Sequence, residues 1–304
     1  MQTPSPVWFW WANQRVVSDV GLPLRRAEPR PTSAEADVSV YRGDAARQIA
    51  WATDPRTDIR SGTRLGRLHD GALAAQFDLR GQPWLRIDAD RSHVTLQGPF
   101  HDYLALSVVN LAMPLLASEQ ERMVFHAAAV RFGPVAHVIV AHSGVGKSTF
   151  AARSKQRGAE VLSDDCTVID QDGGHRTVVG SQAPIRLNPD SASLLGIAGG
   201  PADVTGKVPV GGKAGPAIPI RLGGIFELAP GDQKSEPNIE ELSAPRQVKL
   251  LDEHSMSAGT YSRIARSCQV TKLVTLSADH PLRQLTYHRS VHGVDAAIDL
   301  LARW

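Results

Sequence analysis

The sequence predicts an α/β fold in which a small β-rich N-terminal domain, residues 1–98, precedes a larger domain of mixed sheet and flanking helices, residues 99–304. Short apolar or alternating runs divided by Gly, Pro and Asp fill the first third of the chain. Apolar residues then recur at helical spacing over 101–117, and a strand–loop–helix pattern occupies 135–158. A chain of 304 residues has room for one large or two ordinary domains.

The overall composition is that of an ordinary globular protein, with 42% hydrophobic and 21% charged residues. A net charge of +2 is too small to indicate a nucleic-acid partner or binding to an anionic membrane. The two cysteines, Cys166 and Cys268, have no zinc-binding spacing. The longest apolar stretch, near Leu104–Leu116, falls short of a membrane span, and the N-terminus lacks a signal-peptide pattern. We therefore expect a soluble cytoplasmic protein.

In the first third, the apolar runs predict short strands at 7–17, 38–43, 74–81, 83–89 and 93–98. The 101–117 segment carries Leu104, Val108 and Leu111 on one helical face and predicts a helix that joins the two domains. Pro114 is expected to kink this helix or end it early.

In the larger part, a Gly133-Pro134 turn separates two predicted strands, and Gly158 closes the helix that follows the loop. Further strands are predicted at 159–170, 177–189 and 282–289, and the segment 218–228 is predicted to be a strand or a strand pair. Helices are predicted at Ala244–His254, Ser257–Arg266 and 292–304, and the glycine-rich segment 199–215 is predicted to be a loop.

The loop before the predicted 147–158 helix fits the pattern G-x-x-x-x-G-K-[ST], with Ala141 at its first position. Backbone amides of such a loop, placed at a helix N-terminus, bind phosphate groups, and glycine allows their close approach. Lys147 would reach the β- and γ-phosphates of ATP, and the Ser148 hydroxyl would hold Mg²⁺. A chance glycine loop is the alternative. The predicted nucleotide-binding residues are Ser143, Gly144, Val145, Gly146, Lys147, Ser148 and Thr149.

Two adjacent carboxylates, Asp164 and Asp165, follow the loop and are expected near the phosphates. One would assist Mg²⁺, and the other would accept a proton from an incoming hydroxyl. Adjacent residues on a strand point to opposite faces, so both can face the site only if the strand ends there. An exposed Asp-Asp turn is the alternative.

These motifs together resemble the catalytic core of the HPr serine kinase/phosphorylase family, which implies a P-loop kinase core of the HPr-kinase type. The segments that carry the resemblance are "FHAAAV" (125–130), "AHSGVGKST" (141–149) and "GAEVLSDD" (158–165). "APIRLNPD" (183–190) and "GPAIPIRLGGIFELAPGD" (215–232) are similar to the HPr-kinase-like proteins encoded with lasso peptide clusters. The resemblance covers residues 125–304 well and the N-terminal third loosely.

The resemblance implies a role for several further residues. His126 corresponds to the family's active-site histidine; the residue alone would suggest a buried strand histidine. Arg186 and Arg221 correspond to family arginines that would neutralise charge on the transferred phosphoryl group. Lys207 or Lys213 could fold over the nucleotide. The resemblance also implies that Asp165 or Asp164 is the general base, that Asp164 assists the metal with Ser148, and that the protein forms a homo-oligomer.

The chain departs from the family at Ala127, where the family has glycine, and at Thr149, where true HPr kinases have glutamate. The later glycine-rich signature associated with phosphorolysis is also missing, so the resemblance implies only the forward kinase reaction.

The predicted function is an ATP- and Mg²⁺-dependent kinase that phosphorylates a serine of a peptide or protein. The subgroup resemblance implies a ribosomal precursor peptide of the lasso type, which the N-terminal domain could dock by strand addition. HPr or a small hydroxyl metabolite is an alternative acceptor. A P-loop nucleotide switch or ATPase, and a non-catalytic paralogue, are alternatives from other classes.

Overall fold

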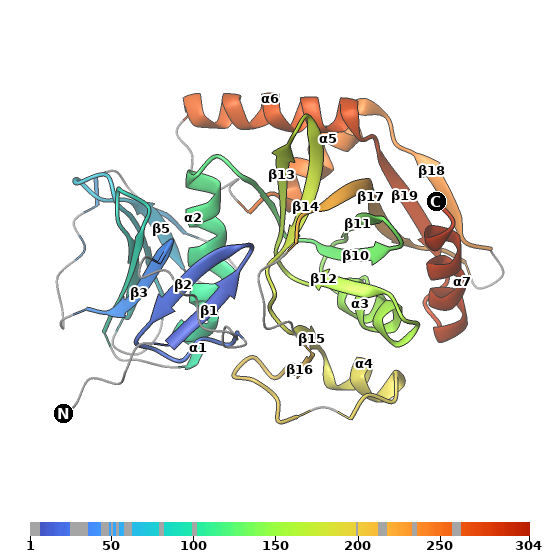
Figure 1. The fold of residues 1–304 in the computed structure, drawn as a ribbon, viewed down its shortest axis with the longest axis horizontal. Coiled ribbons are helices and arrows are strands. Elements are labelled where there is room, and N and C mark those ends of the chain that lie inside the picture. The colour runs from blue at the N-terminus through green and yellow to red at the C-terminus, as the bar shows by residue number, and fades with distance from the viewer. Residues whose placement is uncertain are drawn as a thin grey trace.

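The computed structural model describes residues 7–24, 36–43, 49, 51–52, 55–57, 63–78, 82–98, 102–198, 200–211, 218–232, 236–256 and 263–304. Within these residues the chain forms an eight-stranded sheet, a nine-stranded sheet and a two-stranded sheet. Figure 1 shows the first sheet on the left and the second on the right, with a long helical segment between them. The helices described have no stretch long and apolar enough to cross a bilayer.

The eight-stranded sheet is built from the N-terminal part of the chain, in the order β1-β2-β3-β8-β7-β6-β5-β4. The pairs β2–β3 and β3–β8 are parallel, and the other pairs are antiparallel. Most of the strand runs predicted in this region are strands. The bounds are β1 Val7–Trp11, β2 Gln14–Ser18, β3 Val38–Arg42, β4 Arg56–Thr57, β5 Arg64–Arg67, β6 Leu73–Gln76, β7 Trp84–Ile87 and β8 His93–Gln97.

The helical segment after β8 has three parts: α1 Asp102–Ser107, the π-helical segment η1 Val108–Ala112, and α2 Met113–Glu119. The predicted kink at Pro114 is replaced by a widened turn. Proline has no N–H to donate and cannot continue a regular helix, so the π segment precedes it and Pro114 occupies the first turn of α2. The helical segment shares one hydrophobic core with β1–β3 and β6–β8.

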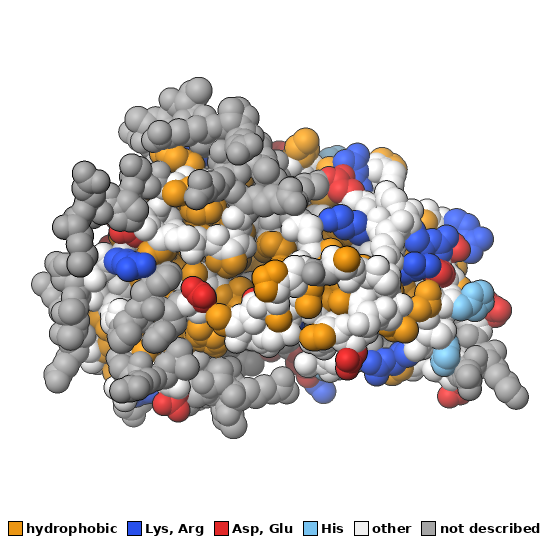
Figure 2. Space-filling model, turned by 90° about the horizontal axis from the view of Figure 1, so that it is seen from below, with side chains coloured by type: hydrophobic (Ala, Val, Ile, Leu, Met, Phe, Trp, Pro, Cys, Tyr) orange, Lys and Arg blue, Asp and Glu red, His pale blue; other side chains and the backbone are white. Residues whose placement is uncertain are grey.

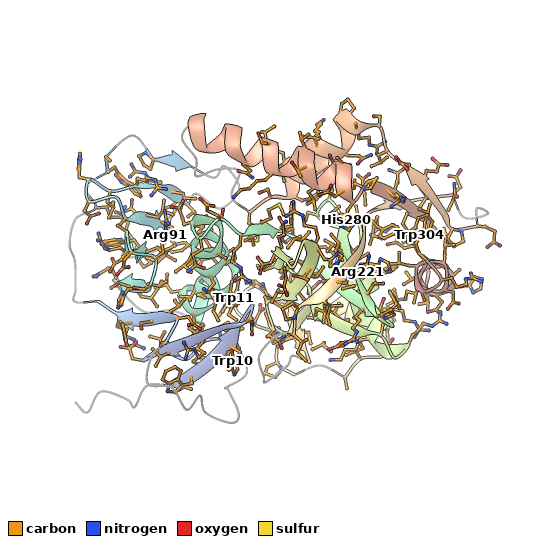
Figure 3. All side chains as sticks on the ribbon, turned by 45° about the horizontal axis from the view of Figure 1, so that its top comes forward. Trp10, Trp11, Arg91, Arg221, His280 and Trp304 are labelled. Atoms are coloured by element: carbon orange, nitrogen blue, oxygen red, sulfur yellow. The ribbon has the colours of Figure 1, made fainter. Side chains whose placement is uncertain are left out.

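That core extends into the second sheet through the buried side chains of Val124, Cys166, Val168 and Val179. The helical segment therefore packs against both sheets at once. Trp11, labelled in Figure 3, is fully buried in the same core. This packing fixes the N-terminal sheet relative to the strands that carry the site described below.

The nine-stranded sheet is mixed, with the main order β12-β10-β11-β17-β14-β13-β9 and with β19 beside β17 and β18 beside β19. The strands β11, β17 and β19 are parallel to one another, whereas the remaining pairs are antiparallel. The bounds are β9 Met123–Phe125, β10 Ala128–Phe132, β11 Val135–Val140, β12 Glu160–Ser163, β13 Thr167–Asp172, β14 His175–Gly180, β17 Ile220–Pro230, β18 Asn238–Glu241 and β19 Leu282–Tyr287.

Helices cover both faces of this sheet. On one face, α3 (Lys147–Gln156) and α7 (Val291–Ala302) pack through Phe150 and Ile298 against a core that includes Phe226. On the other face, α5 (Ala244–His254) and α6 (Arg263–Asp279) contribute Leu250, Leu251, Leu273 and Leu276. The hairpin of β15 (Ile185–Leu187) and β16 (Val208–Val210), with α4 (Pro189–Leu194), lies below α3 in Figure 1. The predicted fold class, a mixed sheet with flanking helices, is confirmed.

Several predicted elements differ from the structure. The run 7–17 contains two strands, β1 and β2, and the run 177–189 contains the end of β14 and all of β15. The single strand predicted at 159–170 is two strands, β12 and β13, which pair with different neighbours and are separated by a bend at 164–166. The helix predicted at Ser257–Arg266 begins, within the described residues, at Arg263 and continues to Asp279, because apolar side chains such as Leu273 and Leu276 bury against the sheet. Residues 257–262 of that prediction, and Lys213, lie outside the described part of the chain.

Gly180, in β14, marks a close contact between β14 and β12. A Cβ atom at this position would overlap the main-chain carbonyl of Leu162. We expect Gly180→Ala to lower the free energy of unfolding by about 1–3 kcal/mol, since the strands must move apart to relieve the clash. Urea denaturation followed by circular dichroism measures the change. Gly200→Ala is the matched control, because a Cβ there meets nothing within 4 Å; equal stability of the two variants would contradict the prediction.

Candidate active site

The loop between β11 and α3 has the conformation that phosphate binding requires. Gly144 and Gly146 have φ angles of 82° and 117°, in the left-handed region that favours glycine. A Cβ at Gly146 would also lie 3.1 Å from the Tyr287 hydroxyl. The first amides of α3 have no acceptor within the helix, so they are available to an anion at its N-terminus. Ala141, at the first position of the motif, is buried in the core beneath the loop, where a methyl group fits.

The end of β19 braces this loop from outside the motif. The Tyr287 hydroxyl donates to the Val145 carbonyl at 3.3 Å, and Arg289 Nη2 donates to the Gly144 carbonyl at 2.7 Å. Tyr287 is buried, whereas Arg289 is exposed. These two contacts engage the carbonyls of Val145 and Gly144 and tie the loop to the end of β19.

Lys147 lies directly beside the aspartate pair. Its Nζ donates to the main-chain carbonyl of Asp164, and it lies 3.4 Å from Asp165 Oδ1 and 3.8 Å from Asp164 Oδ1. The lysine side chain is buried. The bend between β12 and β13 therefore brings both carboxyl groups to the lysine of the loop, as the sequence pattern predicts for a strand that ends at this pair.

The two carboxyl groups have different surroundings. Asp164 is 1% exposed, and burial raises the pKa of its carboxyl above the usual value despite the nearby Lys147. Asp165 is 18% exposed, and although desolvation acts to raise its pKa, the positive charges around it, Lys147 foremost, lower the pKa below the usual value. Asp165 is therefore ionised at neutral pH and accessible from the pocket, as a proton acceptor must be.

The surroundings of Asp164 fit a magnesium ion. Its Oδ2 accepts a hydrogen bond from the Arg186 amide at 3.0 Å, whereas Oδ1 is buried and has no hydrogen-bond partner among the residues described. The Ser148 hydroxyl is close enough to influence the pKa of this carboxyl. A carboxylate oxygen and a serine hydroxyl are oxygen ligands of the kind that Mg²⁺ prefers. The Thr149 hydroxyl instead donates to Ser191 Oγ at 3.2 Å.

His126 lies at the edge of the same pocket. Its Nδ1 is 3.1 Å from the Asp165 main-chain oxygen, and its backbone amide donates to the His254 carbonyl at 2.7 Å. Desolvation, with the charge of Lys147, lowers the pKa of the imidazole, so the ring is neutral at pH 7. The His126 side chain is exposed, not buried in the strand. The rings of His142 and His254 lie 5.4 Å apart behind it.

The structure brings Arg186 to the site and leaves Arg221 away from it. Arg186 Nη1 lies 3.5 Å from Asp165 Oδ2, and Arg186 also pairs with Asp203. Arg221 pairs in register with Val135, at the start of β11, whereas the loop follows the other end of that strand. Figure 3 shows Arg221 in the middle of the molecule, beside the label of His280. The correspondence inferred for Arg221 is therefore not supported by its position, because strand direction places it at the opposite edge of the sheet.

The loop, Asp165, Arg186 and Arg289 line one pocket of about 310 Å³, whereas Asp164 is buried behind it. Lys207 also lines it; Lys213 is not described. Residues that the sequence analysis missed are Asn188, Ser191 and Arg289. The position of Arg289 follows from strand direction. The carboxyl ends of parallel strands meet at one edge of a sheet, and β19 is parallel to β17. The segment "LRQLTYHR" therefore ends beside the loop, which the sequence alone does not reveal because it does not give the strand order.

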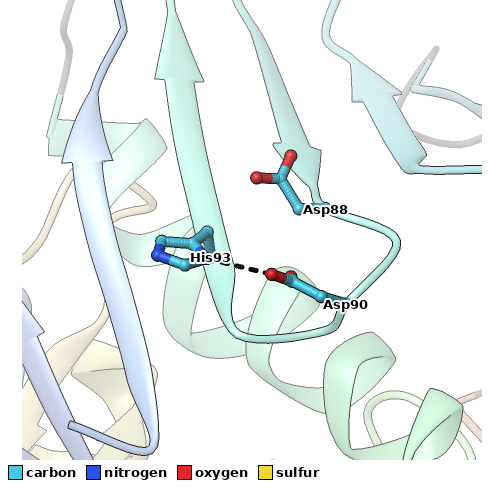
Figure 4. Close-up of side chains that lie close together, drawn as sticks. All are labelled: Asp88, Asp90 and His93. Carbon is cyan, nitrogen blue, oxygen red and sulfur yellow. Dashed lines mark ion pairs between the residues drawn. The ribbon is translucent and has the colours of Figure 1, made fainter. Parts of the chain in front are cut away.

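A second group of titratable side chains, Asp88, Asp90 and His93, lies at the turn between β7 and β8 (Figure 4). Its contacts are local: Asp88 pairs with Arg86 at 2.6 Å, and Asp90 accepts from the Ser92 amide at 3.1 Å. These three side chains do not line the pocket and are accounted for by the turn itself.

Comparison with protein-family models and with curated proteins finds no match. Among solved structures, the chain is similar to the HPr(Ser) kinase/phosphatase from Coxiella burnetii, with 13% sequence identity and a TM-score of 0.30. The similarity covers 59% of this chain and 93% of that chain.

Arg289 should contribute to nucleotide binding although it lies outside the motif. Arg289→Ala removes the hydrogen bond to the Gly144 carbonyl and a positive charge at the pocket, so we expect the Kd for ATP to rise about tenfold, as for the loss of one charge-assisted hydrogen bond. Isothermal titration calorimetry measures it. Arg303→Ala is the control, because Arg303 also donates to a carbonyl but on the surface of α7. Unchanged affinity in Arg289→Ala would show that the loop needs no such brace.

Asp164 should increase the affinity for Mg²⁺ and lower the free energy of unfolding of the metal-free protein. A carboxyl whose folded pKa is raised stabilises the fold only while protonated, so its contribution is lost as pH rises through that pKa. We therefore expect Asp164→Asn to increase the free energy of unfolding at pH 7 in Mg²⁺-free buffer, by on the order of 1 kcal/mol. The same variant should need a higher Mg²⁺ concentration for half-maximal ATP-dependent stabilisation.

Thermal unfolding with and without Mg²⁺ and ATP distinguishes the two effects of Asp164→Asn. If Asp164→Asn were less stable than the parent in the absence of Mg²⁺, the prediction would be wrong. The result would mean that Lys147, 3.8 Å from Oδ1, compensates fully for the burial of the Asp164 carboxylate.

Proposed function

We propose that this chain is a kinase that transfers the γ-phosphoryl group of ATP to a serine hydroxyl of a peptide or protein. The observation that carries the proposal is the position of Asp165: an ionised carboxylate 3.4 Å from the lysine of a phosphate-binding loop, at the side of a pocket open to solvent. This arrangement supports the proposal, because a carboxylate beside the phosphate-binding lysine could accept the proton of a hydroxyl that meets a bound phosphate chain.

Each residue of the pocket has a chemical role in this proposal. The loop amides and Lys147 bind and orient the phosphate chain, while Ser148 and Asp164 would hold Mg²⁺, which neutralises charge on the phosphates. Asp165 accepts the proton of the acceptor hydroxyl as the oxygen attacks the terminal phosphorus in line. Arg186, 3.5 Å from Asp165, holds that carboxylate in place and adds positive charge beside the transferred group.

His126 is neutral and exposed beside the Asp165 main chain, so its imidazole can form a hydrogen bond with the acceptor hydroxyl or a phosphate oxygen. Most of the rate enhancement would come from positioning and charge neutralisation, as in other phosphoryl transfers.

We further propose a ribosomal precursor peptide of the lasso type as the acceptor, on the basis of the sequence segments 183–190 and 215–232. HPr or a small hydroxyl metabolite would use the same chemistry and differ only in what fills the acceptor side of the pocket. The protein would act in the cytoplasm, where ATP is available.

Asp165→Asn separates binding from transfer. Asparagine keeps the shape of the side chain but cannot accept the proton, so we expect ATP affinity within about threefold of the parent and a loss of transfer of about 10²- to 10⁴-fold. Transfer is measured with γ-³²P-labelled ATP and serine peptides, and affinity by calorimetry.

Lys147→Ala is the companion variant to Asp165→Asn and should lose ATP binding itself. Retained transfer in Asp165→Asn would place the base elsewhere. ATP hydrolysis that no acceptor peptide stimulates would favour a P-loop ATPase or switch over a kinase.

A further inference from the structure

A second, mostly apolar cavity of about 370 Å³ adjoins the phosphate pocket. It lies between the helical segment α1–η1 and the β15–β16 hairpin with the turn before β16. Its apolar lining includes Leu22, Leu106, Val109, Ala183 and Pro209. Figure 2 shows hydrophobic side chains gathered across the middle of the face seen from below, the side on which β15, β16 and α4 lie in Figure 1.

Arg186 lines both pockets and forms the partition between them. Its Nη1 atom lies 3.5 Å from Asp165 Oδ2 in the phosphate pocket, and its Nε atom donates to Asp203 Oδ2 at 2.8 Å in the wall of the apolar cavity. One side chain thus separates the proposed base from the cavity. Since one extended residue spans about 3.3–3.6 Å, neighbouring side chains of a peptide could occupy the two pockets together.

The walls of the cavity are preformed. Asp203 accepts hydrogen bonds from the amide of Thr205 at 2.8 Å and from Arg186, so the turn before β16 is tied to the hairpin. The opposite wall contains Val109 and Asn110 of the π-helical segment η1. Segments of π-helix inside α-helices are frequent at functional sites. A rigid apolar cavity loses little entropy when a ligand binds.

The charges at this cavity disfavour an anionic ligand. Arg186 is already paired with two carboxylates, Asp165 and Asp203. Asp102, which also lines the cavity, is an exposed carboxylate. A ligand in this cavity would therefore meet an apolar interior with two polar groups, Asp102 and Asn110. Both can accept hydrogen bonds from peptide amides.

We propose that this cavity binds an apolar side chain of the peptide acceptor, one or two residues from the serine that is phosphorylated. This inference rests on the proposed kinase function and specifies its substrate. The serine hydroxyl lies beside Asp165, the peptide backbone passes Arg186, and the neighbouring side chain enters the cavity, where burial of its apolar surface provides affinity.

The test uses the full chain and pools of acetylated, amidated nonapeptides with a central serine. One flanking position at a time is fixed as Leu, Asp, Lys or Gly, and the label comes from γ-³²P ATP. We expect pools with Leu one or two positions from the serine to be labelled about tenfold more than pools with Asp or Lys there, the discrimination typical of an apolar pocket.

Two variants place a positive charge in opposite walls of the cavity: Asn110→Lys in η1 and Ala202→Lys in the turn before β16. Each should change the preference from Leu to Asp at that position while the Kd for ATP stays within about twofold. Val274→Lys, on the exposed side of α6, is the control and should keep the preference for Leu. Using both variants covers the case in which one of them fails to fold.

The outcomes distinguish this inference from the function on which it rests. Equal labelling of the Leu, Asp and Lys pools would overturn the inference and leave peptide phosphorylation in place. A preference for Leu that neither folded variant changes would also overturn it. An absence of label in every pool, with ATP binding intact, would overturn both the inference and the proposed function.

Discussion

The burial of the Lys147 ammonium group beside two neighbouring carboxyl groups is the interaction on which the rest of the site depends. Lys147 is only 7% exposed, and an unpaired charge at that depth would be strongly destabilising. The bend between β12 and β13 supplies what the lysine needs, a main-chain carbonyl and the Asp165 carboxylate. The N-terminus of α3 and the end of β12 are therefore held together by charge before any nucleotide binds.

The bend also gives two chemically identical side chains different properties. Along a regular strand, Asp164 and Asp165 would point to opposite faces of the sheet. Because the strand ends at Ser163, both reach the region of Lys147, but one is buried under the β15–β16 hairpin and the other borders the pocket. Burial raises one pKa and surrounding positive charge lowers the other. The different roles that we propose for the two carboxyl groups thus rest on backbone geometry.

Features encoded in consecutive residues could be predicted from the sequence, and features that depend on strand order could not. The glycine loop, Lys147 and the aspartate pair are local motifs, and the succession of strands and helices followed from periodicity, whereas the mixed sheet was implied by the family resemblance. Arg221 and Arg289 required the direction and neighbours of β17 and β19 to be known. Without the direction of β17, a strand arginine could not be assigned to either edge of the sheet. The π segment before Pro114 could not be predicted from helical periodicity, which indicates a helix but not the width of its turns.

The β15–β16 hairpin connects the candidate site to the cavity beside α1 and η1 through one residue, Arg186. The Arg186 amide binds Asp164, its guanidinium contacts Asp165, and its Nε atom holds Asp203 against the cavity that faces α1 and η1. A ligand that fills this cavity would contact Arg186, the side chain that lies 3.5 Å from the proposed base, Asp165. In the function that we propose, occupancy of the acceptor cavity and orientation of Asp165 would therefore be coupled through the Arg186 guanidinium group, and an acceptor that fits the cavity would also hold the proposed base in place.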